Sequence, residues 1–226
     1  MVDALIASLQ FFASTLSLAQ SNDDANACGP IANYYGPFDF RIHQIYLPIV
    51  EKHHFTRLVE MLISGQEGYI GADIDYTLHA FPNHPRALIS MTKLFERNKS
   101  RIPEGVSLPL ECYFDRAIRF TPNDTIVRIL YSQFLTNANR PKEALQQLEA
   151  ADFYAKDNAF SHYNIGMAYM DIREYEKALA QAHLAANLGF ERDGLAKRLK
   201  DANQWSEPPA TPPAAEPASG PAKTGG

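Results

Sequence analysis

Small side chains return at a fixed interval in this 226-residue chain. Ala144 and Ala178 lie 34 residues apart, and Ala117 and Ala151 repeat the same separation. All four occur in segments whose composition favours helix, and an alanine where two helices cross lets their backbones approach closely. Intervals of this length are typical of proteins built from stacked helix pairs. Because strand-like alternation is nearly absent, the pattern predicts an all-α fold.

Around Gly166, Tyr169 and Ala178 the chain resembles the tetratricopeptide repeat family, whose 34-residue unit is a pair of antiparallel helices. The resemblance implies an α-solenoid of about four helix pairs, in which Pro82 and Pro122 turn the chain from one unit into the next. A non-repetitive helical bundle with alanine-rich interfaces is the alternative. In chain order, the predicted parts are an irregular segment (20–50), four units within a domain 51–206 (51–84, 85–124, 125–158 and 159–192), and a capping helix (193–206).

The two ends of the chain differ from the middle. Residues 1–19 combine a short apolar run with Ser17 and Ala19, the small residues that signal peptidase requires, although Asp3 stands where a basic residue is usual. They predict a secretory signal, with an amphipathic N-terminal helix as the alternative. Residues 207–226 contain six of the fifteen prolines and no large apolar side chain. We predict that this segment is a disordered tail, because it cannot bury enough apolar surface to offset the loss of chain entropy on folding.

The segment before the repeats is rich in prolines and aromatic side chains. Pro30, Pro37 and Pro48 exclude a long helix there. Because the segment is too apolar to remain in solvent, we expect it to pack on the solenoid. Our hypothesis is that it lies along or across the concave surface. Its aromatic residues are Tyr34, Tyr35, Phe38, Phe40 and Tyr46.

In the tetratricopeptide repeat family the first helix of each pair lines the concave surface, so the resemblance also implies which side chains face the groove. That surface would be more apolar than a solvated groove, and exposed apolar surface of this extent favours a binding site. The implied groove residues are, unit by unit, Lys52, Phe55, Val59 and Leu62; Arg86, Ile89, Lys93 and Arg97; Ile126, Ile129 and Gln133; and Phe160, Tyr163, Met167 and Met170.

These side chains suggest a non-catalytic adaptor that binds an apolar or amphipathic peptide segment. The basic residues Arg86, Lys93 and Arg97 would take a carboxylate of that peptide. Burial of some groove residues against the chain's own N-terminal segment is the alternative reading, and self-association through the same groove is another. An exported adaptor of this kind would act in the cell envelope, for example in a secretion, pilus or polymer-export assembly.

The chain has two cysteines, Cys28 before the aromatic segment and Cys112 in the second unit. If the chain is exported, a bridge between them would tie the segment to the helices. Two free thiols in a cytoplasmic protein are the alternative. Lipid modification of Cys28 is a minor alternative, because Cys28 lies beyond the end of the apolar run. The sequence thus leaves both a periplasmic or secreted location and a cytoplasmic one open.

Charge and motifs argue against several other classes of function. The formal charge of −5, the pI near 5.8 and the lack of a Lys/Arg run disfavour a nucleic-acid binder. No apolar run is long enough to span a membrane. The histidines do not show the spacing of a helical metal site, and we expect neither a metal nor another cofactor. Asp73 and Asp75 remain the basis of an alternative reading as an enzyme or enzyme accessory domain, although helix capping explains them better.

Overall fold

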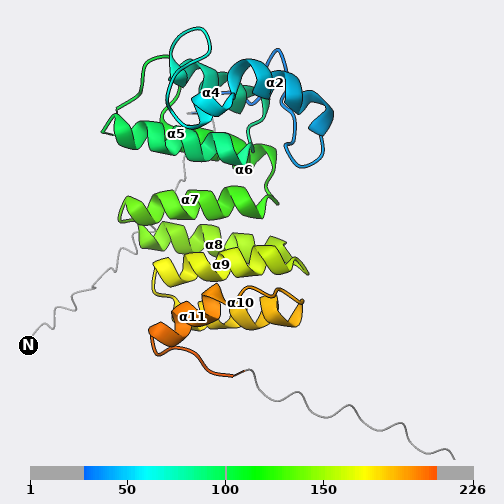
Figure 1. Cartoon of the computed structure of the whole chain (residues 1–226), viewed down its shortest axis with the longest axis vertical. Helices are drawn as coiled ribbons and strands as arrows, with labels where there is room; N and C mark the ends of the chain where they lie inside the picture. The colour runs from blue at the N-terminus through cyan, green and yellow to red at the C-terminus, as the bar shows by residue number, and fades with distance from the viewer. Residues whose placement is uncertain (1–27, 100, 208–226) are drawn as a thin grey trace, which may run out of the picture.

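The computed structural model describes residues 28–99 and 101–207, and these contain helices but no strand. The predicted signal peptide, and the predicted tail beyond Glu207, lie outside the described residues. The helices follow one another along the long axis of the molecule in chain order (Figure 1). No helix of the described part is long and apolar enough to cross a membrane. The elements are η1 (Gln44–Tyr46), α2 (Leu47–His54), α3 (Arg57–Glu60), α4 (Ile70–Ala80), α5 (Pro85–Arg97), α6 (Leu110–Phe120), α7 (Thr125–Asn137), α8 (Pro141–Ala155), α9 (Ala159–Asp171), α10 (Tyr175–Asn187) and α11 (Gly194–Asp201).

Helices that are neighbours in the sequence form packed pairs, and alternate helices join one pair to the next. Helix α7 packs on α8 and α9 packs on α10, while α5, α7, α9 and α11 contact one another in succession. The turns inside the two pairs are alike, because Asn139 and Arg173 both have positive φ. In each turn the next residue donates its N–H to the carbonyl five residues before it, at 2.8 and 3.0 Å. The local geometry thus repeats at the interval seen in the sequence.

Small residues hold the C-terminal helices together. Of the four alanines that define the interval, Ala144, Ala151 and Ala178 are fully buried in these helices, and Ala117 is fully buried in α6. A methyl group added to Gly166 of α9 would overlap the Leu195 side chain of α11 and lie 3.0 Å from Cβ of Gln181 in α10. Glycine at this position therefore lets three helices meet at close range.

Large side chains fill the core of the N-terminal helices instead. Helices α5 and α6 are joined by a long loop, residues 98–109. Because bulky side chains hold helix axes farther apart than alanines do, this half has a different kind of interior. The largest buried side chains of this cluster are Phe55, Met91, Phe95, Tyr113 and Phe114.

The first predicted unit, 51–84, differs from the other three. Helix α2 begins at Leu47, inside the segment that we expected to be irregular, because Pro48 occupies the first turn of the helix rather than closing a loop. Helix α3 is a single turn. A loop over residues 61–69 then leads to α4, so the unit lacks a long first helix.

Residues 28–41 form a segment that we call the strap. Cys28 at its start is disulfide-bonded to Cys112 of α6, so the predicted bridge is present and the two thiols are not free. Arg119 of α6 donates to the carbonyl of Gly29 at 3.0 Å, and Arg116 donates to the carbonyl of Pro30. The bridge points to an oxidising compartment.

The position of the strap differs from our hypothesis of a concave-face location. Besides α6, it contacts the end of α4, where Phe38 donates its N–H to the carbonyl of Ala80 at 2.8 Å. Phe40 donates its N–H to the Asn83 side chain in the next turn at 2.8 Å. The strap thus lies on second helices and on the turns after them, because Cys112 belongs to a second helix and fixes it on that side.

Candidate functional site

Helices α5 and α7 face each other across a hollow of about 240 Å³, which we call the α5–α7 hollow. The lining side chains recur at spacings of three and four residues, so each helix presents one face to it. Three predicted groove residues, Ile89, Lys93 and Gln133, come together here. The full lining is Ile89, Thr92, Lys93, Glu96, Leu130, Gln133, Phe134 and Asn137.

A second hollow, of about 340 Å³, lies where α7 and α9 begin, and we call it the turn hollow. It brings together two further predicted groove residues, Ile126 and the exposed Phe160. The strap contributes Phe40 and Arg41, so the wall of this hollow depends on the strap being in place. The lining is Phe40, Arg41, Asn83, Pro85, Asn123, Asp124, Thr125, Ile126, Tyr154, Ala155, Asn158, Phe160 and Ser161.

The two hollows share one face of α7. Ile126 lines the turn hollow, whereas Leu130 and Gln133 line the α5–α7 hollow. Their spacing of four and then three residues places the three side chains on the same side of the helix. From Ile126 to Gln133 the helix rises by about 10 Å. An extended peptide rises about 3.3 Å per residue, so roughly three of its residues would connect the hollows.

A polar network of four residues lies at the turn hollow, and three of them, Arg41, Asn83 and Asp124, line it. The Arg41 guanidinium lies 2.6 Å from the Asp39 carboxylate and 3.6 Å from that of Asp124. The amide of Asn83 donates to both carboxylates, at 2.7 and 2.9 Å. Burial raises the pKa of Asp39, but the hydrogen bonds from Arg41 and Asn83 outweigh it and lower that pKa to about 2. The network as a whole is net negative, but the charged side chains that line the hollow, Arg41 and Asp124, balance each other.

The rim of the turn hollow offers hydrogen-bond donors and acceptors beside aromatic rings. Asp124 caps α7 by accepting from the N–H of Ile126 at 3.1 Å, and Asn158 caps α9 by accepting from that of Ser161 at 2.9 Å. The hydroxyl oxygens of Thr125 and Ser161 lie 3.1 Å apart. A peptide main chain carries both N–H and C=O groups and suits this mixture. The aromatic rings are those of Phe40, Tyr154 and Phe160.

Four of the predicted groove residues are buried in the core and face no open surface. Phe55 and Val59 belong to the N-terminal core, because the first unit has no long first helix to expose them. The predicted groove residue Ile129 of α7 is buried, and the next residue, the half-buried Leu130, lies on the open face of the helix instead. Met170 is buried among the C-terminal helices. The burial does not come from the strap, as the alternative reading had supposed, but from the helices themselves.

Other predicted groove residues are covered by neighbouring parts of the chain. Tyr163 packs on the ring of Phe190 with centroids 4.7 Å apart. Arg198 of α11 approaches both the carbonyl oxygen and the sulfur of Met167. The capping helix therefore covers this part of α9. Leu62 packs against the N-terminal core, and Lys52 is exposed on α2, away from both hollows.

Two of the three predicted basic residues are engaged within the molecule. Arg86 forms salt bridges to Glu51 and Glu60. Arg97 donates to the carbonyl of Leu62 at 2.7 Å. Lys93 lines the α5–α7 hollow, but Glu96 lines it too. The structure therefore does not provide a continuous positive surface for carboxylate capture.

Sequence reasoning missed the polar residues at the helix starts. A Pro-Asn dipeptide precedes α5 at residues 82–83 and precedes α7 at residues 122–123, and both asparagines line the turn hollow. This recurrence was visible in the sequence and could have identified them. The contribution of Phe40 and Arg41 could not be found this way, because it depends on where the strap folds back.

Asp73 and Asp75, on which the enzyme alternative was based, hold loops in place through hydrogen bonds. Asp73 accepts from the N–H of Gln66 at 2.7 Å and lies 3.2 Å from a ring nitrogen of His54. Asp75 accepts from the hydroxyl groups of Ser107, at 2.7 Å, and Tyr113. Burial, together with the hydrogen bond to Asp75, raises the pKa of Tyr113 well above its usual range. Neither carboxylate lines the two hollows.

Within residues 28–99 and 101–207, no group of three or more His, Cys, Asp or Glu side chains is placed to hold a metal ion. No protein-family model, no curated protein and no solved structure matches the chain.

Proposed function

We propose that this protein is a non-catalytic adaptor that binds a short peptide segment of another protein along α7. The observation that carries the proposal is the pair of hollows on one face of that helix, whose lining residues Ile126 and Gln133 are separated by a helix rise of about 10 Å. The peptide lies extended, with one apolar side chain against Ile89 and Leu130 and another against Phe160. Its main-chain groups between these anchors meet the amides and hydroxyls at the rim of the turn hollow.

The architecture that we propose for this role is a tetratricopeptide-repeat-like solenoid. Three observations support it: the 34-residue interval, the matching turns at Asn139 and Arg173, and the contacts between alternate helices. A stack of this kind presents first helices side by side, which suits an extended ligand. The peptide we propose is apolar or amphipathic without a required carboxylate, because the arginines of α5 are engaged within the molecule.

We further propose that the protein works in the periplasm or outside the cell. The bridge between Cys28 and Cys112 supports this location, since such bonds form and persist in oxidising compartments. A signal peptide at residues 1–19 would provide the route. The partner would then be an envelope protein, such as a component of a secretion, pilus or polymer-export assembly.

Site-specific photocrosslinking tests the proposed peptide site. A photoreactive amino acid replaces Gln133, which is exposed in the α5–α7 hollow, and in a matched control it replaces Phe153 on α8, which is exposed but lines neither hollow. With an envelope extract, we expect position 133 to label one discrete protein, on a short segment that mass spectrometry identifies. Labelling should fall when Ile89→Asp or Phe160→Asp is introduced, with the circular dichroism spectrum unchanged.

Three results would overturn the proposal. Equal labelling from positions 133 and 153 would show that the α7 face has no special role. Crosslinking to a second copy of the chain would instead establish self-association. Catalytic turnover by the isolated protein, lost on Asp73→Asn with the fold retained, would favour the enzyme reading.

A further inference from the structure

Helix α2 is apolar on two opposite sides, although it lies at one end of the helix stack (Figure 1). Leu47 and Val50 face inward and are buried against Phe81. On the other side Ile42, Ile45 and Ile49 are 71%, 83% and 56% exposed, respectively. Ile42 lies in the turn before η1, Ile45 in η1 and Ile49 in α2, and we call these three exposed residues the α2 stripe. Exposed apolar side chains gathered in one place normally mark a binding surface.

A pocket of about 270 Å³ adjoins the α2 stripe, and we call it the end pocket. Ile49 borders both features. The far wall is held in place, because the His54 ring stacks on Tyr76 with centroids 3.9 Å apart and contacts Asp73. A preformed apolar pocket beside an exposed apolar row is the arrangement in which one buried anchor side chain dominates binding. The pocket is lined by Tyr35, Ile49, Val50, His53, His54 and Tyr76.

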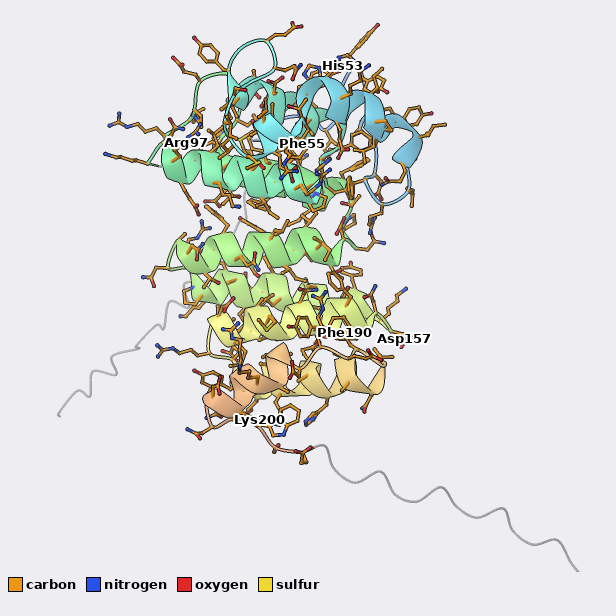
Figure 2. All side chains as sticks on the ribbon, in the orientation of Figure 1. His53, Phe55, Arg97, Asp157, Phe190 and Lys200 are labelled. Carbon is orange, nitrogen blue, oxygen red and sulfur yellow. A yellow bond between two sulfur atoms is a disulfide. The ribbon has the colours of Figure 1, made fainter. Side chains whose placement is uncertain are left out.

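His53 and Lys200 lie at opposite ends of the molecule (Figure 2), and these two ends differ in the helices that pack on them. At the end that carries Lys200, the amphipathic helix α11 buries Leu195 and Leu199 against α9 and α10. At the end that carries His53, no helix of the described residues lies over the stripe. Helix α11 has eight residues and one apolar face. It therefore shows that a short amphipathic helix can cover an end of this fold.

The charges around the stripe indicate what kind of helix fits. Lys52 lies three residues after Ile49, on the same side of α2, and is exposed. The one carboxylate of α2, Glu51, forms a salt bridge to Arg86 of α5 and is not available to the outer side. Two copies of α2 facing each other would therefore offer no carboxylate to Lys52, in either relative direction. A helix with an acidic polar face would offer one.

We propose that the α2 stripe and the end pocket form a second docking surface, and that its occupant is an amphipathic helix of another protein with an acidic polar face. Apolar side chains of that helix cover Ile42, Ile45 and Ile49, one of them enters the end pocket, and a carboxylate meets Lys52. This surface is separate from the α7 face, so the protein can hold two partner segments at once.

Binding of designed helical peptides tests the proposal directly. The probe is a fluorescent peptide of about 18 residues, long enough to populate helix. It carries leucines on one face and glutamates on the other, and its matched counterpart carries lysines in place of glutamates. Fluorescence anisotropy should show at least about tenfold tighter binding of the acidic peptide. The double variant Ile45→Asp/Ile49→Asp should weaken that binding by at least about tenfold, because it removes the apolar row.

Two further variants complete the test. Lys52→Glu should reverse the preference between the acidic and the basic peptide. Leu184→Asp, an exposed position on α10, should leave binding unchanged. A photocrosslinked ligand at position 133 should not compete with the probe, which separates this surface from the α7 site.

Several outcomes would overturn the proposal. Equal affinity of the acidic peptide for the wild type and for the stripe variant would do so, and so would no binding at all. A concentration-dependent dimer that the stripe variant loses would assign the surface to a second copy. Flotation with vesicles of zwitterionic and anionic phospholipid, lost in the same variant, would assign it to a membrane.

Discussion

The N-terminal and C-terminal halves of this protein stack their helices by different means. From α7 to α11 the core contains several alanines beside its large side chains, and Gly166 lets α9 approach α10 and α11 closely. From the strap to α6 the contacts are made by aromatic and other large side chains, and a disulfide and two arginine–carbonyl hydrogen bonds hold the strap in place. The comparison shows that a helical stack can be read from its sequence only where small residues at fixed positions hold it together, because many combinations of large side chains fill a wider space equally well.

Removing the disulfide should have the largest effect and should act mainly on the N-terminal half. The bridge joins residues 84 positions apart, for which the chain-entropy model gives roughly 4.5 kcal/mol of stabilisation. We expect the variant Cys28→Ala/Cys112→Ala to lose about that much in urea-induced unfolding. Hydrogen exchange should speed up first in α4 and α6. If α9 and α10 lose protection equally, the two halves do not differ in the way described.

A cavity in the aromatic core should cause the second-largest loss of stability. Phe114 is almost fully buried, and its ring stacks on that of Tyr131 with centroids 4.9 Å apart. Truncation to alanine should cost about 4 kcal/mol of the free energy of unfolding, measured in urea with the disulfide intact. The control Phe153→Ala, at an exposed position, should change stability by less than about 0.5 kcal/mol. A small loss at Phe114 would mean that the N-terminal half tolerates empty space.

Acid should weaken the N-terminal half through one histidine. Burial, helped by the charge of Arg86, lowers the pKa of His84 to about 3. The neutral ring accepts the N–H of Ala87 at 3.1 Å as the cap of α5, and its other nitrogen faces Glu51. Between pH 6.5 and 3 the unfolded chain binds more protons at this site, so stability falls as the pH falls. At pH 5 the loss should be about 2 kcal/mol relative to pH 7.

The variant His84→Asn isolates this effect, because asparagine keeps a capping acceptor but does not titrate. Its free energy of unfolding should vary less between pH 7 and pH 5, by about the same 2 kcal/mol. Asp39 does not interfere in this window, since its pKa falls from 3.8 to about 2 on folding and its contribution is lost only below about pH 4. An unchanged pH slope in the variant would remove His84 from the explanation.

The smallest effect should come from a single methyl group in the C-terminal half. Gly166→Ala introduces an overlap with Leu195, and the cost of about 1–3 kcal/mol is partly offset by the better helix propensity of alanine, about 1 kcal/mol. We expect a net loss near 1 kcal/mol. In a Leu195→Ala background the same change should be neutral or stabilising. Additive effects in this double-mutant cycle would show that the contact with α11 is not what requires glycine.

The sequence predicted the all-helical fold because alanines recur at 34 residues and strand-like alternation is nearly absent, and it offered the Cys28–Cys112 bridge as one of two readings. The sequence-based prediction was wrong where the orientation of a single side chain decides which residue faces the open surface. On α7 it chose Ile129 for the open face, but the helix turns Leu130 outward instead. The face on which the strap packs depends on long-range contacts, such as that between Phe40 and Asn83, which leave no periodic signal.

The same contacts that hold the strap also complete the turn hollow, since Arg41 and Phe40 belong to both. A covalent link at Cys28 keeps these two residues at high effective concentration near the start of α7. Completion of the turn hollow is therefore linked to oxidation of the two cysteines. Under the proposed function, the chain reaches full affinity for its partner only after Cys28 and Cys112 have paired, which sets an order of events from folding to partner capture.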